Sequence, residues 1–311
     1  MAIIEIILPV FGIVLIGYVA GRSKFFKASD IEGVSKFVFN IAIPVMLFRT
    51  MATVELPDQI EWGYLASYYI GAFAVYGFGM ITGRTAFSQH LGEQGVFGLG
   101  AAYSNLVLLG IPLVLLTFGE EGTVPMFMLL AFHSALMFLT VSAIGEFNRG
   151  RGQSIGSLLQ ATFLGLAKNP IVGGLMLGLL FNLMKWTIPD PIDQIIGTLG
   201  AAGVPGAVFS LGASLSLYRL AGHLPETLTL VGLKLLIHPI LVYLLATFVF
   251  QVDPLWTSVA VLVAALPVGV NVYLFAQRYN ACIAPVATSI LLSTALSVVT
   301  ISVLLMLLNI A

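Results

Sequence analysis

Two asparagines lie next to helix-breaking residues inside long apolar runs of the sequence. Asn105 precedes Gly110–Pro112 by five residues, and Asn271 follows Pro267–Gly269. Proline has no amide hydrogen and glycine loosens the same turn, so a backbone carbonyl freed there must meet protein or water rather than lipid. A side-chain amide donates hydrogen bonds to a carboxylate without burying a charge of its own. We predict that the two interruptions face a cavity that binds an anion, although each alone also fits a kink with an asparagine joining two helices.

The elements that must position these residues are membrane helices. Of the 311 residues, 59% are hydrophobic and 9% are charged, whereas a soluble domain carries about 25% charged residues. The composition therefore predicts an all-α polytopic membrane protein embedded in the lipid bilayer. The net charge of −1 indicates no nucleic-acid partner, and the one cysteine, Cys282, excludes an internal disulfide and a cysteine-based metal site. We predict no metal and no cofactor.

An apolar run of about 20 residues spans a bilayer. The sequence contains ten such runs, at residues 2–21, 31–52, 62–83, 95–118, 124–144, 166–184, 193–217, 226–250, 255–277 and 283–309. The first run is followed rather than preceded by positive charges, which is typical of a first span and not of a signal peptide.

The basic residues predict the orientation, because lysine and arginine concentrate in cytoplasmic loops. Connections after odd-numbered spans hold nine of them and connections after even-numbered spans hold one, Lys185. The nine are Arg22, Lys24, Lys27, Arg84, Arg149, Arg151, Lys168, Arg219 and Arg278. Both termini are therefore expected outside, in a bacterial inner (plasma) membrane.

The two halves of the chain share landmarks at an offset of 161 residues. Pro9, Gly12, Gly17 and Pro44 fall on Pro170, Gly173, Gly178 and Pro205. We interpret residues 1–144 and 166–311 as five-helix repeats joined by a cytoplasmic loop at 145–165. Five spans is an odd number, so the repeats are inverted, as in many secondary transporters. The interrupted spans four and nine then occupy equivalent places, which is the best sequence indication of a transport site near the bilayer midplane.

Three stretches resemble the auxin efflux carrier (PIN-like) family, within the superfamily of bile, arsenite and riboflavin-type carriers. They are NLVLLGIPL at Asn105–Leu113, ALPVGVNVYLFAQRYN at Ala265–Asn280 and SKFVFNIAIPVMLF at Ser35–Phe48. The resemblance implies two inverted five-helix repeats in which spans four and nine cross. It also implies a transport domain of spans three, four, five, eight, nine and ten, and a scaffold of spans one, two, six and seven that often dimerises. The long cytosolic loop of plant members is absent, which indicates a prokaryotic member.

The resemblance implies that Asn105 holds a substrate carboxylate and that Pro112 and Pro267 make the crossing. Asn271 is a candidate by position only, and the third span lacks the acid that plant members carry there. The candidate substrate-binding residues are Tyr103, Ser104, Asn105, Gly110, Ile111, Pro112, His133, Pro267, Val268, Gly269 and Asn271.

Three ionisable residues within the spans are further candidates. Lys234 and His238 are four residues apart on one helix face, and either support the anion path or serve locally, by snorkelling and by bonding a carbonyl near Pro239. His133 is either a satisfied interhelical residue or part of a proton relay.

The function predicted from these features is a secondary, elevator-type carrier of small organic anions that works by alternating access. No nucleotide-binding loop or hydrolase motif occurs in the sequence, so we do not expect an enzyme. Uniport and coupling to sodium or protons all remain open, as does a receptor or sensor of the same fold that binds without translocating. A sodium/proton antiporter is disfavoured because no buried aspartate is visible.

Overall fold

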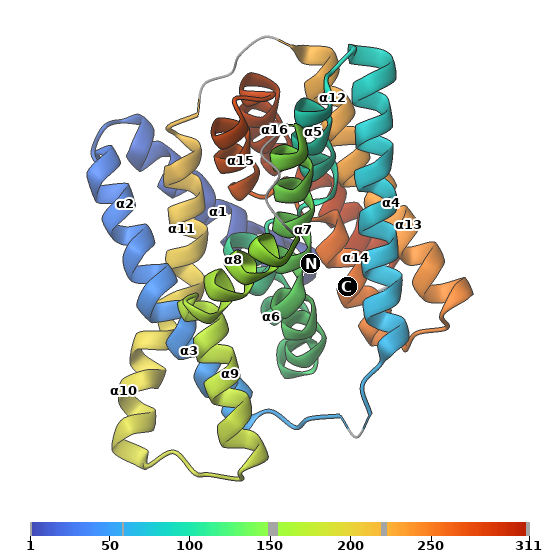
Figure 1. Ribbon diagram of the computed structural model, residues 1–311. Coiled ribbons are helices and arrows are strands. Elements are labelled where there is room, and N and C mark those ends of the chain that lie inside the picture. Colours follow the sequence, from blue (N-terminus) through green and yellow to red (C-terminus); the bar gives the residue numbers. More distant parts are fainter. Residues whose placement is uncertain (1, 58, 149–154, 219–222, 309–311) are drawn as a thin grey trace. The chain divides into compact units, whose positions relative to one another are not determined.

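A computed structural model describes residues 2–57, 59–148, 155–218 and 223–308 (Figure 1). Within these ranges the regular structure is helical, and the one extended pairing is an isolated antiparallel bridge between Ser104 and Val268. By its contacts the chain divides into two compact units, which are described separately.

Seven described helices are long and apolar enough to cross a membrane, or eight if the bent pair Leu159–Ala167 and Pro170–Leu183 forms one span. The chain is an integral membrane protein. One of the seven is a continuous stretch of 43 residues, Leu106–Asn148. At 1.5 Å per residue this stretch would be about 65 Å long, twice the hydrocarbon thickness. It contains Gly119 at φ 59°, which is the first residue of a 3-10 turn, η3 (Gly119–Gly122).

The first unit comprises Met1–Ile60, Val107–Phe127 and Leu164–Leu217. Its complete helices are α1 (Ala2–Arg22), α2 (Ala28–Phe37), η1 (Val38–Ala42), α3 (Ile43–Thr53), α6 (Ile111–Phe118), α9 (Pro170–Leu183), α10 (Asp190–Ala201) and α11 (Gly203–Leu215). Prolines begin several of these helices, where a missing amide hydrogen is harmless. Pro170 is one example, after an Asn169 side chain that accepts from the Ile171 amide at 2.9 Å.

Glycines let two helix pairs of this unit approach closely. Helix α1 packs against α11, and α3 against α9. A Cβ added at Gly17 would collide with the carbonyl oxygen of Phe209, and one at Gly178 would lie 2.5 Å from the carbonyl oxygen of Phe48. Lipid gives helices no hydrophobic reason to associate, so small residues that permit close backbone contact hold such pairs together.

The substitution Gly17→Ala is expected to weaken the α1–α11 pair. Its methyl group would meet backbone, which cannot rotate away, and such overpacking costs about 1–3 kcal/mol. Gly12→Ala is the matched control on the same helix, because its Cβ would meet nothing within 4 Å. We expect a lower melting temperature in detergent for the first variant only; equal values for both variants would contradict the packing argument.

The second unit comprises Glu61–Leu106, Met128–Phe163 and Tyr218–Ala311. Its complete helices are α4 (Trp62–Phe87), α5 (Leu91–Ala102), α12 (Leu224–Gly232), η4 (Leu233–Ile237), α13 (His238–Leu244), η5 (Leu245–Val249), α14 (Pro254–Ala265), α15 (Asn271–Tyr279) and α16 (Ile283–Leu307). The boundary between the units falls within η2 (Leu106–Gly110), α7 (Thr123–Asn148) and α8 (Ile155–Ala167).

Two local hydrogen-bonding features of the second unit fix α5 against α4 and cap the start of α14. The Tyr76 hydroxyl on α4 donates to the carbonyl of Gly95 on α5 at 2.7 Å. Helix α14 begins at Pro254, and the Asp253 side chain caps it by accepting from the amides of Leu255 at 2.8 Å and Trp256 at 3.2 Å. Side-chain caps of this kind satisfy amides that have no partner within the helix.

The connection predicted at residues 145–165 differs from a plain loop in its described part. Helix α7 continues to Asn148, and α8 begins at Ile155. Glycines and arginines between residues 145 and 156 suggested a loop, but from Ile155 onward leucine, alanine and glutamine favour helix. The residues at 149–154 lie outside the described part.

Candidate functional site

Two non-helical stretches of the second unit, residues 103–105 and 266–270, run antiparallel side by side, and this pairing is called the crossing below. Helix α5 ends at Ala102 because Tyr103 adopts an extended conformation, with φ −79° and ψ 113°. Helix α14 ends at Ala265 and α15 begins only at Asn271. The amide of Asn105 donates to the carbonyl of Pro267 at 3.1 Å, and the amide of Gly269 donates to that of Tyr103 at 2.9 Å. The backbone groups released by one stretch are therefore partly satisfied by the other.

Side chains from two further helices satisfy the amides at the centre of this crossing. The amide of Ser104 donates to Nε2 of His133 on α7 at 3.1 Å. The amide of Val268 donates to the hydroxyl of Ser293 on α16 at 3.1 Å. Four chain segments thus hold an irregular backbone in place where Ser104 and Val268 are fully buried and an unpaired amide would be costly.

Tyr103 contacts several side chains beside the crossing. Its ring stacks on that of His133, with centroids 4.7 Å apart and planes inclined by 19°. Its hydroxyl lies 2.9 Å from that of Ser134 and accepts from the Asn271 side-chain amide at 3.2 Å. These contacts join both stretches to α7 through side chains as well as backbone.

Two buried hydrogen-bond donors at the crossing have no partner among the residues that the structure describes. The side chain of Asn105 is 4% exposed, and its Nδ2 makes no hydrogen bond. A backbone amide can only donate, so Nε2 of His133 accepts from Ser104, and the neutral ring carries its hydrogen on Nδ1. That Nδ1 atom is also buried without a partner. Buried donors are normally bonded, so an acceptor from a ligand or water is expected here.

A lysine from another helix lies against the C-terminal end of α14. Lys234 is fully buried on η4, and its Nζ donates to the carbonyl of Ala264. The same atom lies 3.3 Å from Nδ1 of His238. The ring of Tyr68 on α4 lies 5.6 Å from the ring of His238 and 5.7 Å from that of His133.

The structure gathers most, but not all, of the candidate residues. Residues Tyr103, Ser104, Asn105, His133, Pro267, Val268, Gly269 and Asn271 meet at the crossing, and Lys234 and His238 lie at the end of α14. Gly110 ends η2 and Ile111 and Pro112 begin α6, so these three belong to the other unit. Pro112 thus lies in the first turn of a helix, where proline is well tolerated, while the non-helical residues lie upstream at 103–105.

Three contact residues were not among the candidates: Tyr68, Ser134 and Ser293. Each is a hydroxyl-bearing residue inside an apolar run. Such residues are common in membrane helices, where they also bond their own backbone. No spacing pattern distinguished these three from the other hydroxyl-bearing residues of the apolar runs.

The family model described as "Membrane transport protein" matches residues 2–305 of the chain. The chain belongs to the Membrane transport protein family. This is the PIN-like auxin efflux carrier family that the motifs around Asn105 and Pro267 predicted, and it is a family of transporters rather than enzymes.

Similar proteins come from bacteria, plants and animals. The chain is 26% identical to "Putative malonate transporter" of Rhizobium meliloti (strain 1021), over 98% of this chain and 95% of that one. It is 22% identical to "Auxin efflux carrier component 8" of Arabidopsis thaliana, over 89% of each. It is 26% identical to "Lysosomal cholesterol signaling protein" of Mus musculus, over 94% of this chain but 36% of the mouse protein.

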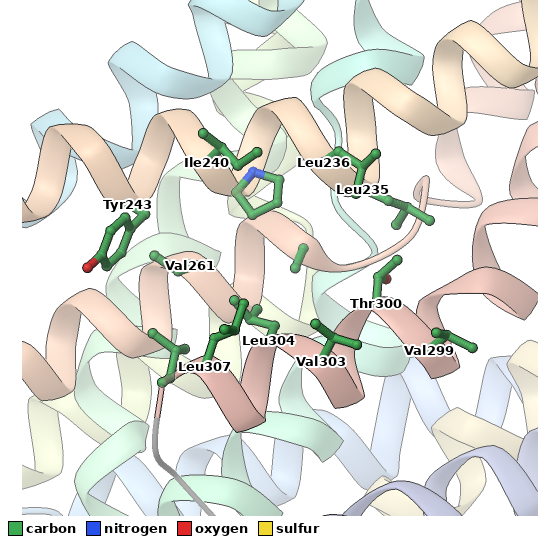
Figure 2. Close-up of a pocket in the computed structure, with 13 residues that line it drawn as sticks. Leu235, Leu236, Ile240, Tyr243, Val261, Val299, Thr300, Val303, Leu304 and Leu307 are labelled. Atoms are coloured by element: carbon green, nitrogen blue, oxygen red, sulfur yellow. The ribbon is translucent and has the colours of Figure 1, made fainter.

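The second unit of this family member also contains an apolar pocket of about 560 Å³ (Figure 2). Figure 2 shows Leu236, Ile240 and Tyr243 on one helix facing Thr300 and Val303 on another. No charged side chain lines this pocket. A carboxylate would find little to bind there, so the crossing is the candidate site for an anion.

Proposed function

We propose that the protein is a secondary carrier of small organic anions and binds its substrate at the crossing of residues 103–105 and 266–270. The observation that carries this proposal is the buried Asn105 amide, whose Nδ2 donor has no partner in the described part of the chain. The Nδ1 donor of His133 is buried and unpartnered as well. A set of donors without matching acceptors suits a ligand that brings oxygen acceptors, and a carboxylate brings two.

Helix ends strengthen the preference for an anion. Helix α15 begins at Asn271, directly after the crossing, and its first turn contains no acidic residue. The N-terminus of a helix carries partial positive charge and favours negatively charged groups. The substrate class we infer is therefore mono- and dicarboxylates, and the names of the bacterial and plant relatives, which refer to malonate and auxin, support it.

We infer ten membrane crossings arranged as two inverted repeats. Helices α1 and α11 hold spans one and seven, and α3 and α9 hold spans two and six. In two five-span repeats, span one is equivalent to span six and span two to span seven. The pair of spans one and seven is therefore equivalent to the pair of spans six and two. Their glycine contacts support this, because Gly17 approaches Phe209 while Gly178 approaches Phe48, and 161 residues separate both Gly17 from Gly178 and Phe48 from Phe209.

Transport would proceed by alternating access, with the second unit as the transport domain and the first as the scaffold. This assignment is supported by the crossing, which lies within the second unit, and by the backbone-contact glycines of the first. Placement in a bacterial plasma membrane with both termini outside, and dimerisation through the scaffold, stay predictions.

The proposal is tested with purified protein in two steps. Melting temperature is measured in detergent with malonate, acetate or indole-3-acetate. Malonamide, which has a shape similar to malonate but no charge, serves as the control. A ligand at 100 times its Kd stabilises by about 2.7 kcal/mol, so at least one carboxylate is expected to raise the melting temperature while malonamide does not. Uptake of that carboxylate is then measured in proteoliposomes.

The outcomes separate the candidate functions. Binding with uptake supports the carrier, and uptake driven by an imposed voltage, proton or sodium gradient identifies the coupling. Binding without uptake favours a receptor or sensor of the same fold; the name of the mouse relative refers to signalling. No response to any carboxylate would contradict an anion site at the crossing.

A further inference from the structure

Lys234 is buried in the second unit, and no carboxylate within the described ranges pairs with it. It is 0% exposed in the π-helical turn η4, and its hydrogen-bond partners are the carbonyl of Ala264 and Nδ1 of His238. The sequence contains no aspartate or glutamate after Asp253, which precedes α14, so α14, α15 and α16 offer no carboxylate to this lysine. A buried ammonium group is costly unless it is compensated, so its surroundings must provide negative potential in another form.

The carbonyl that Lys234 contacts has lost its helical partner. In a continuous helix the carbonyl of Ala264 would accept from the amide of Val268. Here that amide donates to the hydroxyl of Ser293 instead, because α14 ends at Ala265. The Nζ atom of Lys234 therefore takes up an acceptor that the interruption of the helix creates.

The end of α14 is a place that favours a cation. Unpaired carbonyls and the helix dipole give a C-terminus partial negative charge. In interrupted transporter helices, such C-terminal ends and unwound carbonyls coordinate the coupling sodium ion or proton. In this protein the position next to the Ala264 carbonyl is taken by a side chain of the protein itself.

We propose that Lys234 is a resident cation that replaces a coupling metal ion at the C-terminal end of α14, so that organic-anion binding at the crossing requires no sodium. This inference rests on the proposed function. In this proposal the lysine is charged and balances the end of the helix, and the substrate carboxylate adds the negative charge that the protein does not supply.

Contacts connect the lysine to the crossing. Nδ1 of His238 lies 3.3 Å from Nζ of Lys234, and the ring of Tyr68 contacts the rings of both His238 and His133. His133 in turn binds the amide of Ser104. Removing the lysine charge would therefore disturb the end of α14 and weaken attraction for the anion at the same time.

The test compares malonate binding, or binding of the carboxylate that stabilises best, in sodium chloride and in choline chloride at equal ionic strength and pH. The wild-type protein is expected to bind equally in both salts. Lys234→Ala and Lys234→Met both remove the charge and are expected to lose at least tenfold in affinity in choline. Only the alanine variant leaves room for a small ion, so ammonium or sodium is expected to restore its binding and not that of the methionine variant.

Several results would overturn the inference. Wild-type binding that falls more than threefold without sodium would show a sodium site that the lysine has not replaced, and this arm needs no substitution. Wild-type affinity in Lys234→Ala, or a folded alanine variant that no cation restores, would also overturn it. If neither uncharged variant folds, Lys234→Arg decides, because retained sodium-independent binding supports a resident charge and its loss contradicts one. Failure of the wild-type protein to bind any carboxylate would instead contradict the proposed function.

Discussion

The variant Asn105→Ala is expected to lose carboxylate binding while keeping its stability. A hydrogen bond to a charged group contributes about 1.5–3 kcal/mol, and each 1.4 kcal/mol corresponds to a factor of about ten in affinity. Malonate affinity should therefore fall by about 10- to 150-fold. Nδ2 of Asn105 bonds no group of the described residues, so its removal leaves none of their donors or acceptors newly unpaired. Titration calorimetry measures the affinity, and detergent melting measures the stability.

Asn182→Ala is the control variant, and it is expected to change stability rather than affinity. This half-buried asparagine on α9 donates from Nδ2 to the carbonyls of Met51 at 2.9 Å and Val54 at 2.6 Å. Asn182→Ala leaves both carbonyls without that donor, which costs about 1–3 kcal/mol, and it lies in the first unit rather than at the crossing. We expect lower stability with unchanged Kd. If Asn105→Ala instead lowers the melting temperature and leaves the Kd unchanged, Asn105 is a packing residue and not a ligand.

The long helices could be predicted because a bilayer demands about 20 apolar residues in a row. The runs at 62–83 and 283–309 correspond to α4 (Trp62–Phe87) and α16 (Ile283–Leu307). The π-helical turns η1 and η4 could not be predicted in this way. When nearly every residue in a span is apolar, the pattern carries no period, and a turn of different pitch leaves no trace in the sequence.

The part of the candidate site that depends on helix-breaking residues could be predicted from the sequence. The part that depends on how different spans pack together could not. Proline and glycine near 267–269 directed attention to a stretch that the structure leaves non-helical. At the other stretch, Pro112 directed attention too far along the chain, because the non-helical residues are Tyr103, Ser104 and Asn105. Ser293 and Ser134 were beyond sequence reasoning, since no spacing within one span states which residue of another span it will meet.

The variant Gly269→Ala is expected to abolish uptake and to lower stability. Its Cβ would collide with the ring of Tyr103 and lie 3.2 Å from the carbonyl oxygen of Ser104. The amide of Gly269 also donates to the Tyr103 carbonyl at 2.9 Å, so the two stretches cannot separate without losing a backbone bond. We expect uptake at background level, together with a stability loss of about 1–3 kcal/mol from overpacking.

Two comparisons show whether the collision causes this loss. Gly232→Ala adds the same methyl group in a helix of the same unit with nothing within 4 Å, so uptake and stability should stay at wild-type values. Adding Tyr103→Ala to Gly269→Ala removes the ring, and the stability costs of the two changes should then sum to more than the cost of the double variant. Uptake should not return, because the Tyr103 hydroxyl that binds Asn271 is also gone. Additive stability costs, or normal uptake by Gly269→Ala, would mean that the close crossing does not hold the transport site together.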